Sequence, residues 1–328
     1  MSAPLRWDAH ACIPLHPQAS LDPLLRYHRA GVGYVSVNVG MDMNPVEQVM
    51  SSLAGFRASI QRDPQLTLAG DLAEIRAAHA RGLLSVGFDL EGALPLLELP
   101  EMVYLYRDLG VRQIHLAYNR NNSAASGCHD RDEGLSRLGV SLIHAMNRAG
   151  VIVDCSHMSV RSSVEAAQCS ERPVVFSHAN PLTLAQHGRN INDSQIRAVS
   201  DSGGVICLSG VNAFLGEELP TLETLIQHIL YVVDLVGVKH VGVGLDVGFH
   251  QDGIDDDPPA PFDADYWWPP SAGYADGISQ IRYLPPASWA ELPERLSQSG
   301  MTTSEVDAVL GENMARVLAD VERHAESS

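Results

Sequence analysis

The chain lacks the features of a disulfide-rich or membrane-spanning protein. Its 328 residues include only five cysteines, an odd number without a Cys-x-x-Cys pair, so we expect reduced thiols rather than a disulfide framework. No run approaches the roughly 20 apolar residues that a membrane-spanning helix needs. The first residues, MSAPLRWDAH, also contain no apolar stretch of signal-peptide length. These observations lead us to expect a cytoplasmic protein with no membrane partner.

Positive charge is also scarce. The sequence has 22 Lys and Arg residues against 40 Asp and Glu residues, which gives a formal net charge of -18. Such a surface repels nucleic-acid phosphates and anionic lipids, so a nucleic-acid partner is not expected. Apolar residues make up 45% of the chain, which is enough for one large core.

Apolar runs of strand-like composition alternate with helical patterns over about 240 residues. The eight strand-like runs are 6–13, 33–40, 83–90, 111–118, 151–157, 173–178, 204–210 and 240–248. The clearest helical patterns are 46–60, 71–81, 98–109, 134–149, 159–170, 193–202 and 221–236. This count and length predict an α/β fold, a (β/α)8 TIM-type barrel, formed by a single domain over 1–328.

Two segments follow the last strand-like run. Residues 249–287 contain many prolines and the aromatic triplet Tyr266-Trp267-Trp268, and so long an insertion is typical of a lid or an interface. Residues 302–322 have a helical pattern, and we expect this C-terminal helix to pack on the barrel.

Polar side chains mark the ends of the predicted strands, where the active sites of such barrels lie. Three histidines and two carboxylates come from five strands: His10, Glu91, His157, His178 and Asp246. Each residue alone could be a hydrogen-bonded structural residue. Several buried titratable groups together are costly unless they are paired or bind a metal, and imidazoles with a carboxylate suit zinc.

The order of these residues suggests two metal positions. Glu91 is the natural bridge, His157 and His178 come from adjacent strands, and His10 with position 12 would hold the second ion. Paired metals activate a water and polarise a carbonyl oxygen. Asp246 would then be the base that passes a proton to the leaving amine.

At these residues the sequence resembles the renal (membrane) dipeptidase family of zinc hydrolases. The similarity is strongest over 134–215, which includes GVIVDCSHMS and RPVVFSHANP, and LGENMARVL at 310–318 is similar to the closing helix of that family. The resemblance implies hydrolysis of a dipeptide or acylated amino acid at a binuclear zinc centre, with His10, Glu91, His157 and His178 as ligands. It implies that Asp246 is catalytic and that Arg189 binds the substrate carboxylate. Family members commonly form homodimers, so a homodimer is a further expectation.

Two residues depart from the family pattern. The first motif, usually Asp-x-His-x-Asp, is here Asp8-Ala9-His10-Ala11-Cys12, and a histidine that helps to hold the scissile carbonyl is replaced by Tyr118. Tyr118 can still donate one hydrogen bond to substrate. Cys12 could ligate zinc as a thiolate, could be a buried spectator beside a weak or empty metal position, or could be a nucleophile with His10 as its base.

These departures leave two alternatives to a zinc-dependent dipeptidase. One is a related metallo-hydrolase with a single firmly bound metal, acting on N-acyl D-amino acids or a lactone. The other is a catalytically silent barrel used for binding, although the presence of all six residues His10, Glu91, His157, His178, Arg189 and Asp246 argues against it.

Overall fold

The computed structural model describes residues 4–254, 258, 262–274, 277–323 and 325 of the chain. Its strands are β1 Trp7–Cys12, β2 Tyr34–Met41, β3 Leu66–Leu68, β4 Leu84–Glu91, β5 Val111–His115, β6 Ile152–Asp154, β7 Val175–Phe176, β8 Val205–Leu208, β9 Val241–Val243 and β10 Val247–Gly248. Its α-helices are α1 Leu25–Arg29, α2 Val46–Arg62, α3 Leu72–Ala80, α4 Met102–Asp108, α5 Arg137–Ala149, α6 Val160–Cys169, α7 Asp193–Asp201, α8 Asn212–Leu215, α9 Leu222–Val236, α10 Ala264–Trp267, α11 Leu292–Gln298, α12 Thr303–Asp307 and α13 Asn313–Arg323.

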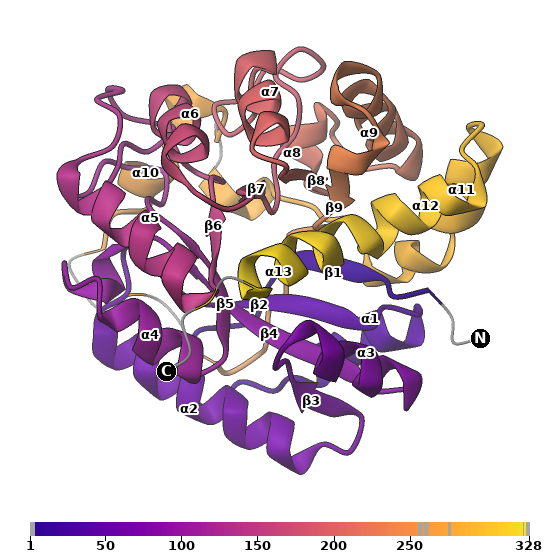
Figure 1. Cartoon of the computed structure of the whole chain (residues 1–328), viewed down its shortest axis with the longest axis horizontal. Helices are drawn as coiled ribbons and strands as arrows, with labels where there is room; N and C mark the ends of the chain where they lie inside the picture. Colours follow the sequence, from indigo (N-terminus) through magenta and orange to yellow (C-terminus); the bar gives the residue numbers. More distant parts are fainter. Residues whose placement is uncertain (1–3, 255–257, 259–261, 275–276, 324, 326–328) are drawn as a thin grey trace.

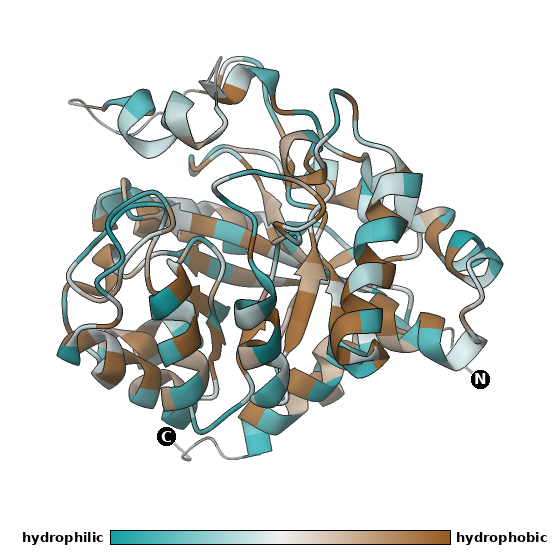
Figure 2. Cartoon of the chain, turned by 90° about the horizontal axis from the view of Figure 1, so that it is seen from above, coloured by the Kyte–Doolittle hydropathy of each residue, from teal (hydrophilic) through white to brown (hydrophobic). Residues whose placement is uncertain are grey.

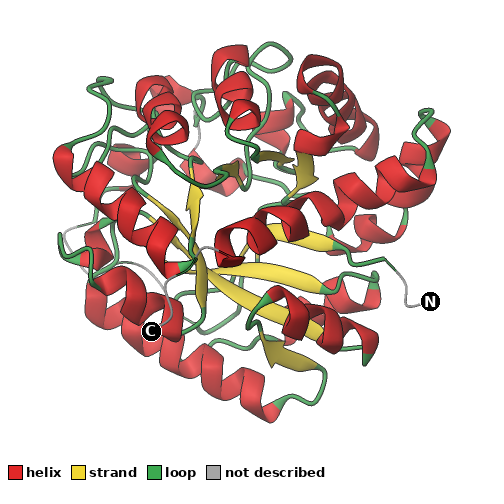
Figure 3. Cartoon of the chain, viewed as in Figure 1, coloured by secondary structure: helices red, strands yellow, loops and turns green. Residues whose placement is uncertain are grey.

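The strands form one parallel sheet that curls into a barrel, with helices around its outside (Figures 1 and 3). The order is β10-β1-β2-β4-β5-β6-β7-β8-β9, and β3 pairs only with β4. The eighth predicted run, 240–248, contains both β9, which pairs with β8, and β10, which pairs with β1. This one segment therefore joins the two ends of the sheet, and the predicted α/β barrel is confirmed.

All eight predicted runs contain strands, and among the described residues the short β3 is the one strand outside them. The eighth run is interrupted because Leu245 and Asp246 turn their backbone N–H groups toward β1. Leu245 donates to the Asp8 carboxylate, and Asp246 donates to the carbonyl oxygen of His10. The interruption places the Asp246 side chain beside the end of β1.

Helix α13 closes the N-terminal end of the barrel. Its buried Met314, Val317 and Leu318 belong to an apolar cluster with the residues that begin five of the strands. These first residues are Trp7, Tyr34, Ile152, Val175 and Val205. In Figure 2 the central strands are coloured mainly as hydrophobic, whereas the surrounding helices carry hydrophobic and hydrophilic residues. One end of the barrel is therefore filled, and only the opposite end remains for a site.

The segment after β10 is more ordered than the sequence indicates. It contains α10 and several 3-10 turns, and the cluster of Val211, Phe214 and Tyr274 has Trp268 and Tyr283 packed against it. Parts of the predicted 249–287 insertion, including the acidic run 255–257, lie outside the described residues. The predicted C-terminal helix is present as α12 and α13, joined by a π-helical turn at 308–312.

Within the part of the chain described above, no helix combines the length and apolar character needed to cross a bilayer.

Candidate metal centre

A cluster of buried polar side chains lies at the C-terminal end of the barrel, and its members come from five strands. His10 lies on β1, Glu91 ends β4 and His115 ends β5. His157 and His178 follow β6 and β7 directly. All five side chains are at least 93% buried, although each carries a titratable group.

The four imidazoles converge on one oxygen atom of Glu91. The distances to Glu91 Oε1 are 2.9 Å from His157 Nε2, 3.3 Å from His178 Nε2, 3.5 Å from His10 Nε2 and 3.9 Å from His115 Nδ1. The Nε2 atoms of His157 and His178 are themselves 2.9 Å apart. The other carboxylate oxygen, Oε2, accepts a hydrogen bond from the Asn38 side chain.

An oxygen atom of another side chain lies against the far nitrogen of every ring. These pairs are His10 Nδ1 with Asp89 Oδ1 at 3.2 Å, His115 Nε2 with Asp154 Oδ2 at 2.7 Å, His157 Nδ1 with Asn119 Oδ1 at 2.7 Å and His178 Nδ1 with Ser177 Oγ at 2.8 Å. Such partners fix the ring orientation and the tautomer of metal-ligating histidines. In a neutral imidazole, when one ring nitrogen donates to a carboxylate or amide oxygen, the second nitrogen carries a lone pair. In this cluster the second nitrogen is the one that faces Glu91.

The protonation tendencies differ within the cluster. Against the effect of burial, Asp89 and Glu91 raise the pKa of His10, and Asp154 raises the pKa of His115. Burial lowers the pKa values of His157 and His178 well below their usual range, and the Arg189 charge acts in the same direction. Burial raises the pKa of Glu91 to about 7, against the opposing effect of His10. Neutral imidazoles are the form that binds a metal, and several lone pairs facing one carboxylate oxygen are stable when a cation lies between them. The donor set therefore fits a divalent metal such as zinc.

Cys12 contributes a sulfur atom to the same cluster. Its Sγ is 3.4 Å from His10 Nε2, and Cys12, His10 and Glu91 together offer ligand atoms that lie within 4.8 Å of one another. Burial raises the pKa of Cys12 to about 12. Without a cation beside it the thiol is therefore protonated, which argues against the nucleophile that the sequence left open, whereas metal coordination deprotonates a thiol.

Asp246 lies at the rim of the cluster, on the backbone that joins β9 to β10. Its Oδ1 is 3.7 Å from His10 Nε2, and its side chain is 17% exposed. Asp246, His157 and Asn119 all have positive φ angles, of 60°, 67° and 59°. Left-handed backbone at residues other than glycine costs free energy, and such strain is common at functional sites.

Tyr118 lies beyond the end of β5 and faces the cluster. Its ring stacks on that of His157, with the centroids 4.3 Å apart. The indole Nε1 of Trp268 donates a hydrogen bond to the Tyr118 hydroxyl at 3.1 Å. Asn119 donates to the carbonyl oxygen of Trp267. The aromatic residues of the insertion thus cover the site, as a lid would.

Arg189 is almost completely buried next to the cluster. Its NH2 group donates to the carbonyl oxygen of His178, and its guanidinium lies 5.5 Å from the centre of the Phe214 ring. Its Nε has no hydrogen-bond partner among the described residues. A buried guanidinium with a free donor fits an anionic group of a substrate, although Arg189 does not itself line the open cavity in this conformation.

A cavity of about 540 Å³ opens above the cluster. Its polar floor is formed by Cys12, Glu91, His157 and Asp246. Its walls are mostly apolar, and they include Met41, Met43, Val211, Phe214, Phe262, Trp268, Tyr274, Ile278, Ile281 and Tyr283. A few polar groups at the bottom of an apolar cleft are typical of a small-molecule site.

Three residues that face the barrel interior near the cluster were not predicted as site residues from the sequence: Asp89, His115 and Asp154. Alternation along β4 places Asp89 on the same face as Glu91, and this signal was available. His115 and Asp154 lie inside apolar runs, and their adjacency depends on the pairing of β5 with β6, which puts them in register. Asp8, in contrast, is structural: its carboxylate accepts from Trp289 Nε1 and from Leu245.

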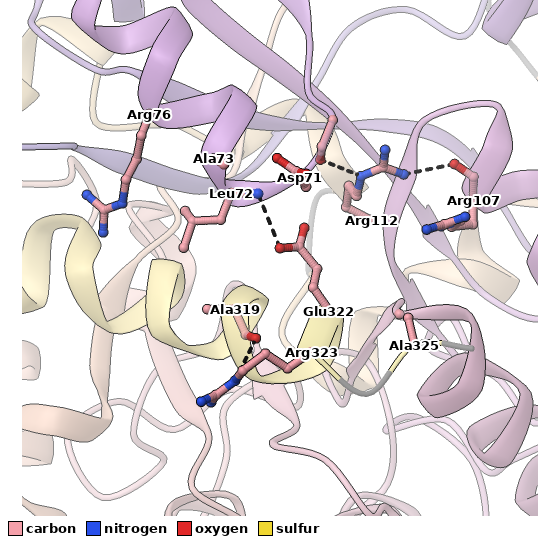
Figure 4. A pocket seen from close by; sticks show the side chains of 12 residues that line it. Asp71, Leu72, Ala73, Arg76, Arg107, Arg112, Ala319, Glu322, Arg323 and Ala325 are labelled. Atoms are coloured by element: carbon pink, nitrogen blue, oxygen red, sulfur yellow. Dashed lines mark hydrogen bonds between the residues drawn. The ribbon is translucent and has the colours of Figure 1, made fainter. Parts of the chain in front are cut away.

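A second cavity of about 600 Å³ lies beside α13, near the N-terminal ends of β5 and β6 (Figure 4). The residues described as lining it include no histidine or cysteine. Its polar groups already have partners: Arg112 donates to the carbonyl oxygens of Gly70 and Arg107, and Glu322 accepts from the Leu72 amide (Figure 4). The larger volume therefore does not mark the chemical site.

Two proteins similar to this chain in sequence are named as dipeptidases. A dipeptidase of Clonostachys rogersoniana, verJ, is 34% identical over 199 residues, which are 58% of this chain and 51% of that protein. An uncharacterized dipeptidase of Schizosaccharomyces pombe is 29% identical over 251 residues, covering 74% of this chain and 54% of the relative. The chain thus spans about half the length of these curated relatives.

Solved structures share the fold. An amidohydrolase from Pseudomonas aeruginosa superposes with a TM-score of 0.84 at 24% identity, over 97% of this chain and 96% of that one. A metallo peptidase from Rhodobacter sphaeroides, liganded with a phosphinate mimic of the dipeptide L-Ala-D-Ala, gives a TM-score of 0.76 at 19% identity, over 98% of this chain and 100% of the other. The family model for membrane dipeptidase, peptidase family M19, matches residues 16–260. The chain belongs to this membrane dipeptidase family, as the motifs in its sequence predicted.

Proposed function

We propose that the chain is a zinc-dependent hydrolase of dipeptides or similar short amides. The observation that carries this proposal is the convergence of four imidazole nitrogens on Glu91 Oε1 at the floor of an apolar cleft. His10, Cys12, Glu91, His157 and His178 would hold the metal. When bound, a divalent ion lowers the pKa of water and polarises the amide carbonyl.

The remaining steps belong to the chain's own residues. Asp246 accepts the proton of the attacking water and delivers it to the leaving amine, since it lies 3.7 Å from a ligand nitrogen and reaches the cavity. Tyr118 orients the scissile amide through its hydroxyl, which Trp268 holds in place. Arg189 binds the substrate carboxylate through its free guanidinium donors. The aromatic residues of the insertion line the cleft and limit the access of water to it.

Cys12 favours one alternative. Where the related motif has a carboxylate, this chain has a thiol that is protonated when no cation is bound. One of the two metal positions would then be weak, and the chain would act with a single firmly bound ion on N-acyl D-amino acids or another substrate that is not a dipeptide.

The experiment is turnover by the full chain, freed of metal with a chelator and then reconstituted with zinc. We expect hydrolysis of dipeptides with apolar side chains, and slower hydrolysis of N-acyl amino acids and lactones. Elemental analysis separates the two candidates: about two zinc ions per chain support the dipeptidase, and about one supports the alternative. Absence of turnover on every amide, together with unchanged zinc binding by Glu91→Ala, would refute the dipeptidase; absence of turnover on N-acyl amino acids and lactones as well would refute the alternative.

A further inference from the structure

His115 differs from the other three histidines because neither the strand-end motifs nor the proposed ligand set includes it. It ends β5, and the sheet register aligns it with Glu91 on β4 and with Asp154 on β6. Three successive strands thus place a carboxylate, an imidazole and a second carboxylate in one row across the barrel interior. All three side chains are at least 97% buried.

The two nitrogen atoms of His115 have different surroundings. Nε2 is 2.7 Å from Asp154 Oδ2. Asp154 also accepts hydrogen bonds from the amides of Ser156 and Ser177, so its carboxylate is fixed in place. Nδ1 is buried and has no hydrogen-bond partner among the described residues. It points toward Glu91 Oε1, which is 3.9 Å away.

This arrangement is the one that metal-ligating histidines adopt. A carboxylate that accepts from one ring nitrogen selects the tautomer whose other nitrogen binds the metal, and it raises the basicity of that nitrogen. A separation of 3.9 Å is too long for a direct hydrogen bond between Nδ1 and Oε1. It leaves room for an ion whose ligands are each about 2 Å away. Glu91, His115 and His157 also offer three ligand atoms that lie within 4.8 Å of one another.

We infer that His115 is a fourth imidazole ligand, which completes a metal position with Glu91 and His157. His10, His178 and Asp246 form a separate group of the same kind, and Cys12 lies beside His10. This assignment adds His115 to the ligand set predicted from the sequence, which comprised His10, Cys12, Glu91, His157 and His178. The additional imidazole from inside the barrel strengthens the position that does not include Cys12.

This inference rests on the proposed metal centre and not on the choice of substrate. If His115 binds the metal and no amide is hydrolysed, the proposed function fails and the ligand assignment stands. If dipeptides are hydrolysed and His115 binds no metal, the proposed function stands and the ligand assignment fails.

The direct test is a crystal structure of the full wild-type chain loaded with zinc, with anomalous data collected at the zinc edge. We expect an anomalous peak at about 2.1 Å from His115 Nδ1. A fully occupied centre with no peak within about 3 Å of that atom overturns the assignment. This measurement does not depend on the folding of any variant.

A second test uses Co²⁺ as a spectroscopic probe in the chelator-treated protein. We expect His115→Gln to bind one Co²⁺ at least about tenfold more weakly than the parent and to alter its visible absorption spectrum. His144→Gln, on the partly exposed surface of α5, is the matched control and should bind as the parent does. Unchanged stoichiometry, affinity and spectrum in His115→Gln would leave His115 as a buried partner of Asp154 and overturn the inference.

Discussion

The two ends of the barrel are built from the same strands but have opposite chemistry. At the N-terminal end, the first residues of five strands pack against α13 in an apolar cluster. At the C-terminal end, the last residues of the strands present imidazoles and carboxylates to an open cleft. We conclude that the filled end contributes stability and the open end contributes the chemistry. Titratable groups buried at the open end cost free energy unless a ligand or a partner compensates them.

The two cavities support the same division. The cavity beside α13 is slightly larger, but its arginines donate to backbone carbonyls or to neighbouring carboxylates. Near the other cavity, at the C-terminal ends of the strands, four imidazoles converge on one oxygen atom of Glu91. The convergence of several metal-binding side chains, rather than volume, marks the site for a ligand.

The largest expected effect is at the open end. Glu91→Gln keeps the shape of the side chain but removes the charge that faces four imidazoles, so we expect kcat/KM to fall by about 1,000-fold or more. Zinc content, measured by elemental analysis, should fall with it. The matched control is Arg76→Gln, which breaks an exposed ion pair with Glu312 beside the other cavity and should change kcat/KM less than about twofold. Equal losses in both variants would contradict the division between the ends.

The filled end should affect stability without affecting chemistry. Leu318→Ala empties a fully buried position on α13, so we expect the free energy of unfolding to fall by about 2–5 kcal/mol. Denaturant unfolding measures this loss. At temperatures where the variant stays folded, kcat should equal that of the parent; a large fall in kcat with full occupancy of zinc would show that α13 acts on the site.

A pH effect is expected away from both ends. Burial lowers the pKa of His228 on α9 to about 4, and its Nδ1 has no partner among the residues described. The folded state therefore excludes a proton that the unfolded chain binds below pH 6.5. The contribution of neutral His228 to the free energy of unfolding is therefore complete above pH 6.5. As the pH falls from 6.5 toward 4, the free energy of unfolding decreases by about 1 kcal/mol per pH unit.

His228→Gln should remove this slope. We expect the difference in unfolding free energy between the parent and the variant to change by on the order of 2 kcal/mol from pH 6.5 to 4.5. Denaturant unfolding at a series of pH values provides the measurement. The control His250→Gln, at an exposed loop position, should keep the slope of the parent. A parallel pair of curves for His228→Gln and the parent would refute the assignment.

The smallest effect is expected at the lid. Trp268→Phe keeps an aromatic ring but removes the hydrogen bond to the Tyr118 hydroxyl, so we expect KM to rise about fivefold, which corresponds to about 1 kcal/mol. Because the metal ligands are untouched, kcat should stay within about twofold. Steady-state kinetics with one dipeptide measures both constants. A fall in kcat with unchanged KM would mean that Trp268 acts on the chemical step instead of on binding.

Much of the molecule could be predicted from the sequence because the signals are local. Eight apolar runs predicted eight positions of the barrel, and only the three-residue β3 was missed. The residues near the C-terminal ends of strands were therefore expected to converge, because the strands are parallel. They are His10, Glu91, His157, His178 and Asp246. The two departures, Cys12 and Tyr118, were also visible, and the structure places both side chains at the cleft.

The sequence by itself determined the strand–helix alternation, the family motifs and the polar residues that end the strands. Only the tertiary structure decided that His115 and Asp154 join them, because both lie in apolar runs that carry no motif. Their roles depend on register, since the pairing of β4, β5 and β6 aligns Glu91, His115 and Asp154 across the barrel. Register is set by the closure of the whole sheet, in which residues far apart in the chain must meet, and a local pattern contains no record of it.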